Sequence, residues 1–456
     1  MADSPKSVLA ALALYGCAGA SVARQLPQTS TPSVFAIDSA LIRLGAVPLW
    51  PHFDPRTAPI AYFDGERTVL FRHPRPPVGF VAVAGDPTAA VKAGRDSSVT
   101  SNTSIMLDGV RTATVMLAPD RRSSADESAS LAIHELFHVY ERANHPAWTA
   151  NEADLFTYAF DDAPALALRR EETASLRAAL GAQSDDGARC WSGAFLDERR
   201  ARFARLGAAA AAYERGSELN EGLAQYVERR SIGRAPALPA QDYPSERVRE
   251  RVYASGEAIG RLLDRVAPAW RDTLDATPGK STIPLDSLLS NALVGRLGGS
   301  SRCQTAADDR ASFMKSAESE VAALNARRRQ ARADFLAGPG PRVVVVAGSG
   351  PLFPQGFDPL NVQRLSDTEI LHSRFLRLGN GDGTIEMLAH VALTTGKPGE
   401  HPLFAGVQRA MIAGLREMPA VRDSAGTLMV SGHGLTGRFR GAKADSAGST
   451  ITLRLP

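Results

Sequence analysis

The sequence predicts an α+β fold with a larger domain over residues 31–337 and a smaller α+β domain over residues 341–456. Short β-type runs come first, up to Leu117, and helical periodicity dominates from Ser124 onward. A Gly/Pro cluster at residues 338–341 ends the helical region, and a second series of strand patterns follows it. Strands that precede a run of helices, without alternating with them, are typical of the α+β class.

The first part of the larger domain is predicted to form strands and hairpins. β-Type runs bounded by Pro, Gly and Asp cover Thr68–Phe71, Val78–Ala84, Thr103–Leu107 and Val110–Leu117. Asp108-Gly109 joins the last two runs, and Asp64-Gly65 is a second dipeptide of the hairpin type. We therefore expect a strand pair that leads directly into the first long helix.

That helix begins where Ser124 and Glu127 show the S-x-x-E spacing of a capping box. Further helical patterns cover Leu166–Leu180, Phe195–Tyr213, Glu257–Val266 and about Ser319–Leu336. The last of these contains the most basic stretch of the chain, residues 326–332, which we interpret as a solvated helix face.

The C-terminal domain is predicted to combine strands with one helix. Strand patterns cover Val343–Ala347, Thr384–Thr394, Thr427–Val430 and Ser449–Leu455. One helical stretch runs from about Phe404 to Met418. Four histidines of this domain lack metal-ligand spacing and are interpreted as isolated: His372, His390, His401 and His433.

The composition is that of ordinary globular material, with 456 residues, 44% of them hydrophobic and 22% charged. Two domains are expected because a single core rarely grows much beyond about 250–300 residues. A net charge of +3 on so long a chain gives no reason to expect a nucleic acid or an anionic membrane as partner.

The N-terminal segment indicates export. Ser7–Ala23 is uncharged and rich in small and apolar residues, so residues 1–30 are predicted to be a signal peptide or an N-terminal tether. The run is too short and too weakly apolar for a transmembrane span. Leu14-Tyr15-Gly16-Cys17 resembles a bacterial lipobox. A lipid anchor at Cys17 is therefore a second, less favoured form of the predicted export. The alternative is a buried or frayed N-terminal helix.

Two further cysteines, Cys190 and Cys303, could form one disulfide in an oxidising compartment. In a cytosolic protein both would be small apolar core residues. Because the chain has no Cys-x-x-Cys, we do not expect the cysteines to bind a metal.

The segment His134-Glu135-Leu136-Phe137-His138 fits the HExxH pattern of zinc-dependent hydrolases. Positions i and i+4 project from the same face of a helix, so both imidazoles can reach one metal ion. Glu135 is then placed beside the metal, where a carboxylate can take a proton from a zinc-bound water. Ile133 and Tyr140 continue an apolar face of the same helix, which predicts packing into a core. The alternative is a pair of histidines that only fill that core.

A catalytic zinc site usually has three protein ligands and an open position, so a third ligand must lie elsewhere in the chain. The sequence does not match the HExxHxxGxxH class, since Glu141 and Asn144 stand where that class has glycine and histidine. Glu221 is the better candidate because it lies on a predicted second helix with small neighbours. Glu152 is the rival ligand, and the alternative for Glu221 is an ordinary solvated carboxylate.

Gly222 and Ala224 would let the Glu221 helix approach a neighbouring helix closely. Glu221, Gln225 and Glu228 share one face of it at i, i+4 and i+7. We expect Gln225 or Glu228 to accept a hydrogen bond from the far nitrogen of a zinc-bound histidine.

The chain combines the HExxH segment, residues 134–138, with a later segment Asn220-Glu221-Gly222-Leu223-Ala224. In this combination it resembles the gluzincin metallopeptidases whose second helix carries an E-G-x-A signature. The resemblance covers roughly residues 100 to 230. It implies that the larger domain, residues 31–337, is zincin-like, that His134, His138 and Glu221 bind zinc, and that Glu135 is the general base. Two features depart from it. Glu221 follows His138 by 83 residues (221 − 138 = 83), so a mostly helical insertion must fold away from the site. Gln225 stands where the thermolysin-like branch has Asp.

Hydrolysis of an amide builds negative charge on the former carbonyl oxygen, and a Tyr, His or Arg donor usually shares that charge with the metal. Tyr253 is the first candidate for this donor, with Tyr226 and His145 behind it. For each of them an ordinary packing or surface role is the alternative.

These patterns predict a zinc-dependent metallohydrolase, with zinc as cofactor, and the resemblance makes a peptidase acting on peptides or proteins the leading interpretation. A non-catalytic zincin-like protein with a structural or degenerate metal site, acting as an envelope or partner-binding module, is the alternative. Glu135 argues against it because a structural site has no need of a base. An exported binding protein with an accidental motif is disfavoured by the Glu221 segment.

Overall fold

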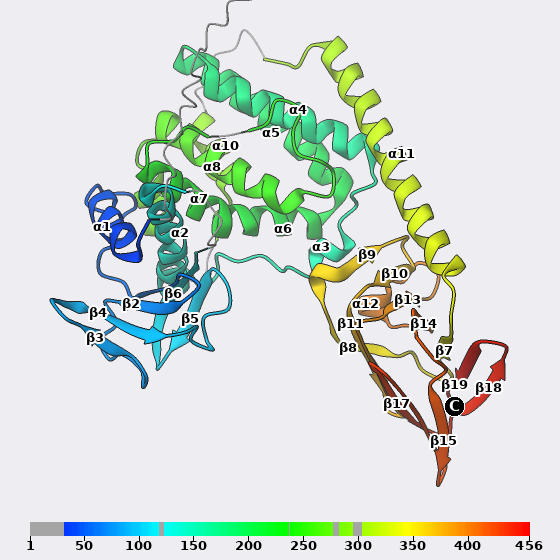
Figure 1. Ribbon diagram of the computed structural model, residues 1–456. Coiled ribbons are helices and arrows are strands. Elements are labelled where there is room, and N and C mark those ends of the chain that lie inside the picture. Colours follow the sequence, from blue (N-terminus) through cyan, green and yellow to red (C-terminus); the bar gives the residue numbers. More distant parts are fainter. Residues whose placement is uncertain (1–31, 118–122, 237, 277–281, 295–302) are drawn as a thin grey trace, which may run out of the picture.

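The computed structural model describes residues 32–117, 123–236, 238–276, 282–294 and 303–456 (Figure 1). Strands come first, a helical body follows, and a second set of strands ends the chain, so the predicted α+β class is confirmed. The predicted signal peptide and Cys17 lie outside the described residues. None of the described helices combines the length and the apolar character needed to cross a membrane.

The N-terminal sheet has six strands in the order β3-β4-β2-β1-β6-β5. They are β1 (Ile60–Phe63), β2 (Arg67–Phe71), β3 (Val81–Val83), β4 (Asp86–Ala93), β5 (Thr103–Leu107) and β6 (Val110–Met116). β1 and β6 are parallel, and the other neighbours are antiparallel. Both predicted hairpins are present, with Gly65 and Gly109 at φ of 99° and 77°, which glycine adopts without steric cost. β5 is the edge strand beside β6.

Helix α2 (Ala125–Asn144) follows β6 and packs between the sheet and α1 (Val34–Leu44). The predicted apolar face is buried, because Ile133, Leu136 and Phe137 are 0% exposed. They contribute to a core that also contains Trp50 and Tyr226. The helix that carries the HExxH segment is therefore fixed on several sides.

The helical body contacts α2 chiefly through its helix α7 (Leu223–Ser231). Its elements are α3 (Asp154–Thr157), α4 (Ala163–Gly181), α5 (Asp185–Leu206), α6 (Ala208–Ser217), η1 (Glu218–Gly222), α7 (Leu223–Ser231), α8 (Val248–Val266), α9 (Trp270–Asp275), α10 (Leu285–Leu293) and α11 (Ala307–Ala337). The prediction of one helix over residues 195–213 is wrong. Gly207 has φ 89° and divides it into α5 and α6, since a helix cannot continue through that conformation.

The C-terminal part consists mainly of two sheets. One has seven strands in the order β18-β19-β7-β14-β13-β10-β9, and the other has six in the order β15-β16-β17-β12-β11-β8. The strands are β7 (Arg342–Val346), β8 (Phe353–Phe357), β9 (Val362–Arg364), β10 (Glu369–His372), β11 (Phe375–Asn380), β12 (Gly383–Leu388), β13 (Val391–Thr395), β14 (Arg409–Ala413), β15 (Ala420–Ser424), β16 (Thr427–Gly432), β17 (Leu435–Arg440), β18 (Lys443–Ala447) and β19 (Thr450–Arg454). A 3-10 turn, η2 (Pro359–Asn361), precedes β9.

Two sequence predictions for this part are wrong. The helix expected over residues 404–418 is only a short α12 (Pro402–Ala405), and β14 replaces the rest of it. β14 lies between β13 and β7 with Ala410 and Ile412 buried, so sheet pairing overrides the local helical pattern. The single strand expected over residues 384–394 is two strands in different sheets, separated by Ala389 at φ 60°.

The long helix α11 runs from the helical body to the C-terminal sheets (Figure 1). Arg328 on it pairs with Asp161 of the body, and Arg332 pairs with Glu369 on β10. The body is also cross-linked, since Cys190 on α5 forms a disulfide with Cys303, as the sequence suggested for an oxidising compartment. Their Cα atoms are 5.4 Å apart, within the normal range for a disulfide.

Candidate metal centre

Helix α2 holds two histidines on one face, one turn apart. The predicted capping box is present: the Ser124 hydroxyl accepts a hydrogen bond from the Glu127 N–H, and the Glu127 carboxylate accepts one from the Ser124 N–H. His134 and His138 are each 6% exposed, and their Nε2 atoms lie 3.2 Å apart. Both Nε2 atoms therefore point to one position.

Glu221 reaches the same position from a π-helical turn, η1, which interrupts the helix between α6 and α7. Such turns occur frequently at functional sites. Glu221 Oε2 lies 3.5 Å from His134 Nε2 and 3.3 Å from His138 Nε2. The close approach expected from Gly222 is also present, because a Cβ there would stand 2.7 Å from the Cα of Gly256 on α8.

The three ligand atoms fit a zinc ion. Bonds of about 2.0 to 2.2 Å in a tetrahedral arrangement separate neighbouring ligand atoms by roughly 3.3 to 3.6 Å. The separations here are 3.2, 3.3 and 3.5 Å. Among the residues that the structure describes, His134, His138 and Glu221 form the one group of three His, Cys, Asp or Glu side chains that could hold a metal ion.

The far nitrogens of both histidines meet carboxylates. His134 Nδ1 lies 3.0 Å from Glu228 Oε2, and His138 Nδ1 lies 2.7 Å from Glu141 Oε2. When Nδ1 donates to a carboxylate, the neutral ring keeps its lone pair on Nε2, which is the arrangement a metal ligand needs. Glu228 was one of two predicted partners. The other, Gln225, donates instead to Glu257 on α8.

Glu141 was not predicted as a partner of His138. It follows His138 by three residues on the same helix, and this i, i+3 spacing is the signal that could have found it. Its side chain is 1% exposed, and burial raises the pKa of its carboxyl to about 7.

Four glutamates surround the two imidazoles: Glu135, Glu141, Glu221 and Glu228. Burial opposes a charge on His134, but its hydrogen bonds to Glu221 and Glu228 raise its pKa to about 10. Burial likewise opposes a charge on His138, but the charge and hydrogen bond of Glu141 raise its pKa to about 9. The site thus favours positive charge, which protons or a metal cation can supply.

Glu135 differs from the other three glutamates. It is 6% exposed, and burial raises the pKa of its carboxyl, while the charges of His134 and His138 partly oppose that shift. Its carboxylate makes no hydrogen bond to any other residue that the structure describes. A buried carboxylate without a fixed partner and with a raised pKa is suited to accept a proton.

The three candidate oxyanion donors differ in whether they contact the two histidines and Glu221. The Tyr253 ring stacks on His134 with centroids 6.2 Å apart, and burial and the nearby Glu221 carboxylate raise the pKa of its hydroxyl. Tyr226 donates instead to Asp264, and His145 bonds to Asp275 and stacks on Trp148. Of the three candidates, Tyr253 is the one that contacts the histidine–glutamate group.

Glu152, the rival ligand, lies outside the group. It is exposed and pairs with Arg249, with Oε2 and Nη1 3.4 Å apart. Arg249 was not predicted at the site, yet its Nη2 lies 3.4 Å from Glu221 Oε1. Its spacing of one helical turn before Tyr253 on α8 is the signal that could have indicated it.

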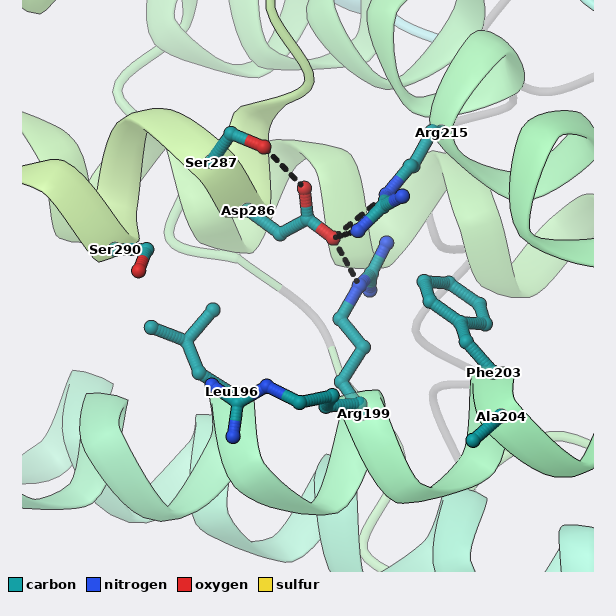
Figure 2. A pocket seen from close by; sticks show the side chains of 9 residues that line it. Leu196, Arg199, Phe203, Ala204, Arg215, Asp286, Ser287 and Ser290 are labelled. Carbon is teal, nitrogen blue, oxygen red and sulfur yellow. Dashed lines mark hydrogen bonds and ion pairs between the residues drawn. The ribbon is translucent and has the colours of Figure 1, made fainter. Parts of the chain in front are cut away.

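Buried ion pairs join the π turn η1 to the neighbouring helices. Arg199 on α5 bonds to Glu218 of η1, to Glu172 on α4 and to Asp286 on α10. Arg199, Asp286 and Arg215 also line a cavity of about 380 Å³ between α5, α6 and α10 (Figure 2). The predicted ligands do not line this cavity, so it is separate from the metal centre.

Comparisons of the chain with family models, with curated proteins and with solved structures found no match.

Proposed function

We propose that this protein is a zinc-dependent metallohydrolase. The observation that carries the proposal is the convergence of His134 Nε2, His138 Nε2 and Glu221 Oε2 at 3.2 to 3.5 Å from one another, beside the buried Glu135. A purely structural site would have no need of an additional carboxylate free to accept a proton.

His134, His138 and Glu221 would hold the zinc ion, and Glu228 and Glu141 would keep the imidazoles in the orientation and tautomer needed for binding. Zinc, when bound in such a site, lowers the pKa of a coordinated water to about 7 and polarises a carbonyl. Glu135 accepts the proton of the attacking water and passes it to the leaving amine. The Tyr253 hydroxyl, held beside Glu221, donates to the carbonyl oxygen as its negative charge grows.

We further propose that the substrate is a peptide. The gluzincin resemblance of the two motif segments supports this choice. A second support is the edge strand β5, which packs against α2 and pairs with no second strand among the described residues. Such an edge can bind an extended peptide through main-chain hydrogen bonds.

We also propose that the protein acts outside the cytosol. The Cys190–Cys303 disulfide supports this location, because structural disulfides form and persist in oxidising compartments. The uncharged Ser7–Ala23 segment of the sequence supports it independently.

The test measures metal content and hydrolysis of a peptide library by the purified protein and by Glu135→Gln. We expect one zinc per chain in both proteins and a loss of about 100-fold or more in kcat for the variant, since general base catalysis contributes about that much. Glu246→Gln is the matched control, since Glu246 is exposed and pairs with Arg327 away from the site. Absence of stoichiometric metal, or zinc without hydrolysis of any peptide, contradicts the proposal.

A further inference from the structure

The carboxylate of Glu221 faces two different groups. Its Oε2 points to the histidines, and its Oε1 lies 3.4 Å from Nη2 of Arg249. The Arg249 side chain is 49% exposed, whereas that of Glu221 is 14% exposed. The guanidinium therefore stands where the metal centre meets solvent, one helical turn before Tyr253.

Arg249 interacts with the hydroxyl of Tyr253, and it is held only loosely by the two carboxylates near it. Its contacts with Glu221 and Glu152 are both 3.4 Å long, whereas charge-assisted hydrogen bonds are usually about 2.7 to 2.9 Å. Glu152 is 54% exposed, and an exposed ion pair of this kind contributes little to stability. A competing carboxylate can therefore take the place of Glu152 at small cost.

A guanidinium offers two parallel N–H donors that match the two oxygens of a carboxylate. Glu152 already presents one carboxylate oxygen to Nη1 of Arg249, so a carboxylate can approach this guanidinium from solvent. A basic substrate group at the same place would meet the positive charge of Arg249. The local chemistry therefore selects for an acidic group on the substrate.

We propose that Arg249 is a specificity residue that binds a carboxylate of the peptide substrate, displacing Glu152 as the substrate enters. This inference rests on the proposed peptidase function. The carboxylate is either an Asp or Glu side chain near the cleaved bond or the C-terminal carboxylate of the peptide.

Two pairs of peptides test the proposal. One pair differs by Glu or Gln next to the cleaved bond, and the other differs by a free or amidated C-terminus. The wild type should cleave the carboxylate member of one pair with a kcat/KM about 10- to 100-fold higher than the neutral member, and the pair that responds identifies the source. Arg249→Gln should abolish that preference through KM, so that the two members of the responding pair are cleaved with equal kcat/KM.

Arg247→Gln is the matched control because it removes the same charge at the exposed start of α8, where Arg247 pairs only with Glu250 among the described residues. It should keep the preference. Glu152→Gln should lower KM for the carboxylate peptide alone, because it removes the competitor of the substrate. If circular dichroism shows that Arg249→Gln does not fold, the KM of Glu152→Gln alone tests the inference.

Two results overturn the inference while leaving the proposed function intact. The first is equal cleavage of both members in both pairs by the wild type. The second is failure of either variant to act as expected, with the preference surviving Arg249→Gln or KM unmoved by Glu152→Gln. Zinc binding without hydrolysis of any of the four peptides instead contradicts the proposed function, and this inference with it.

Discussion

At the scale of single residues, His134 and His138 differ from ordinary core histidines because both nitrogens of each ring are engaged. Each Nδ1 meets a carboxylate, and each Nε2 meets the other imidazole and Glu221. Helical periodicity made the two histidines, Glu221 and Glu228 predictable, since it fixes which side chains share a face. The spacing of Arg249 before Tyr253 could have indicated it, but its contact with Glu221 depends on how α8 packs against η1.

The raised pKa values of the histidines predict how pH acts on the metal-free protein. The pKa values of about 10 for His134 and about 9 for His138 exceed the ordinary 6.5, so protonation of the rings stabilises the fold. This stabilisation is complete below about pH 6.5 and is lost as the pH rises through 9 to 10. Zinc requires neutral rings, so the zinc-bound protein does not depend on it.

We therefore expect the difference in Tm between the zinc-bound and the metal-free protein to widen as the pH rises from 6.5 to about 10. Differential scanning calorimetry on paired samples, with excess zinc removed, measures it. A His134→Gln/His138→Gln double variant should show no widening. A wild-type difference that stays constant or narrows over this range would contradict the expectation.

At the scale of secondary structure, the π turn η1 sets the position of Glu221, the third proposed ligand. The sequence predicted a helix around Glu221 and its close packing through Gly222. It could not predict the π turn, because the extra residue depends on contacts made elsewhere, such as that of Glu218 with Arg199. β14 is a similar case, since its pairing with two neighbours decides its conformation against a local helical pattern.

Gly222→Ala should damage this element. The new Cβ would lie 2.7 Å from Gly256 Cα and 3.2 Å from the Val252 carbonyl oxygen, so α8 and η1 must separate. We expect a loss of about 1 to 3 kcal/mol in the free energy of unfolding and about 10-fold weaker zinc binding. Urea denaturation and competition with a zinc chelator measure the two effects.

Gly181→Ala is the control, since it ends α4 and its added Cβ would meet nothing within 4 Å. It should leave zinc binding unchanged and unfold no more easily than the wild type. If Gly222→Ala retained both the stability and the zinc affinity of the wild type, the close contact would have no role in placing Glu221.

At the scale of the whole molecule, the order of strands, helices and strands followed from the sequence because composition and periodicity change at the boundaries. α11 ends at Ala337 and β7 begins at Arg342, so the Gly/Pro cluster at residues 338–341 falls between them. The arrangement of the C-terminal strands in two sheets did not follow, because neighbours such as β7 and β14 are far apart in the chain. Local patterns carry no information on such pairings.

The disulfide should contribute to the stability of the whole fold. Cys190 and Cys303 are separated by 113 residues, and closing so long a loop restricts the unfolded chain. We expect Cys190→Ala/Cys303→Ala to lower the free energy of unfolding by about 2 to 4 kcal/mol in urea denaturation. Zinc content should be retained, since neither cysteine belongs to the metal group. Equal stability of the oxidised wild type and the variant would show that the cross-link adds nothing.

The long separation between His138 and Glu221 has a consequence for the order of events during synthesis. A growing chain that has passed α2 carries both histidines but not the third ligand, which follows 83 residues later (221 − 138 = 83). Helices α4 to α6 lie between them in the chain and must fold back before η1 can reach α2. The entropy lost in closing this long loop is therefore spent before Glu221 contacts the histidines. The proposed ligand set is therefore completed late in folding, and under the proposed function an unfinished chain would lack a complete zinc site.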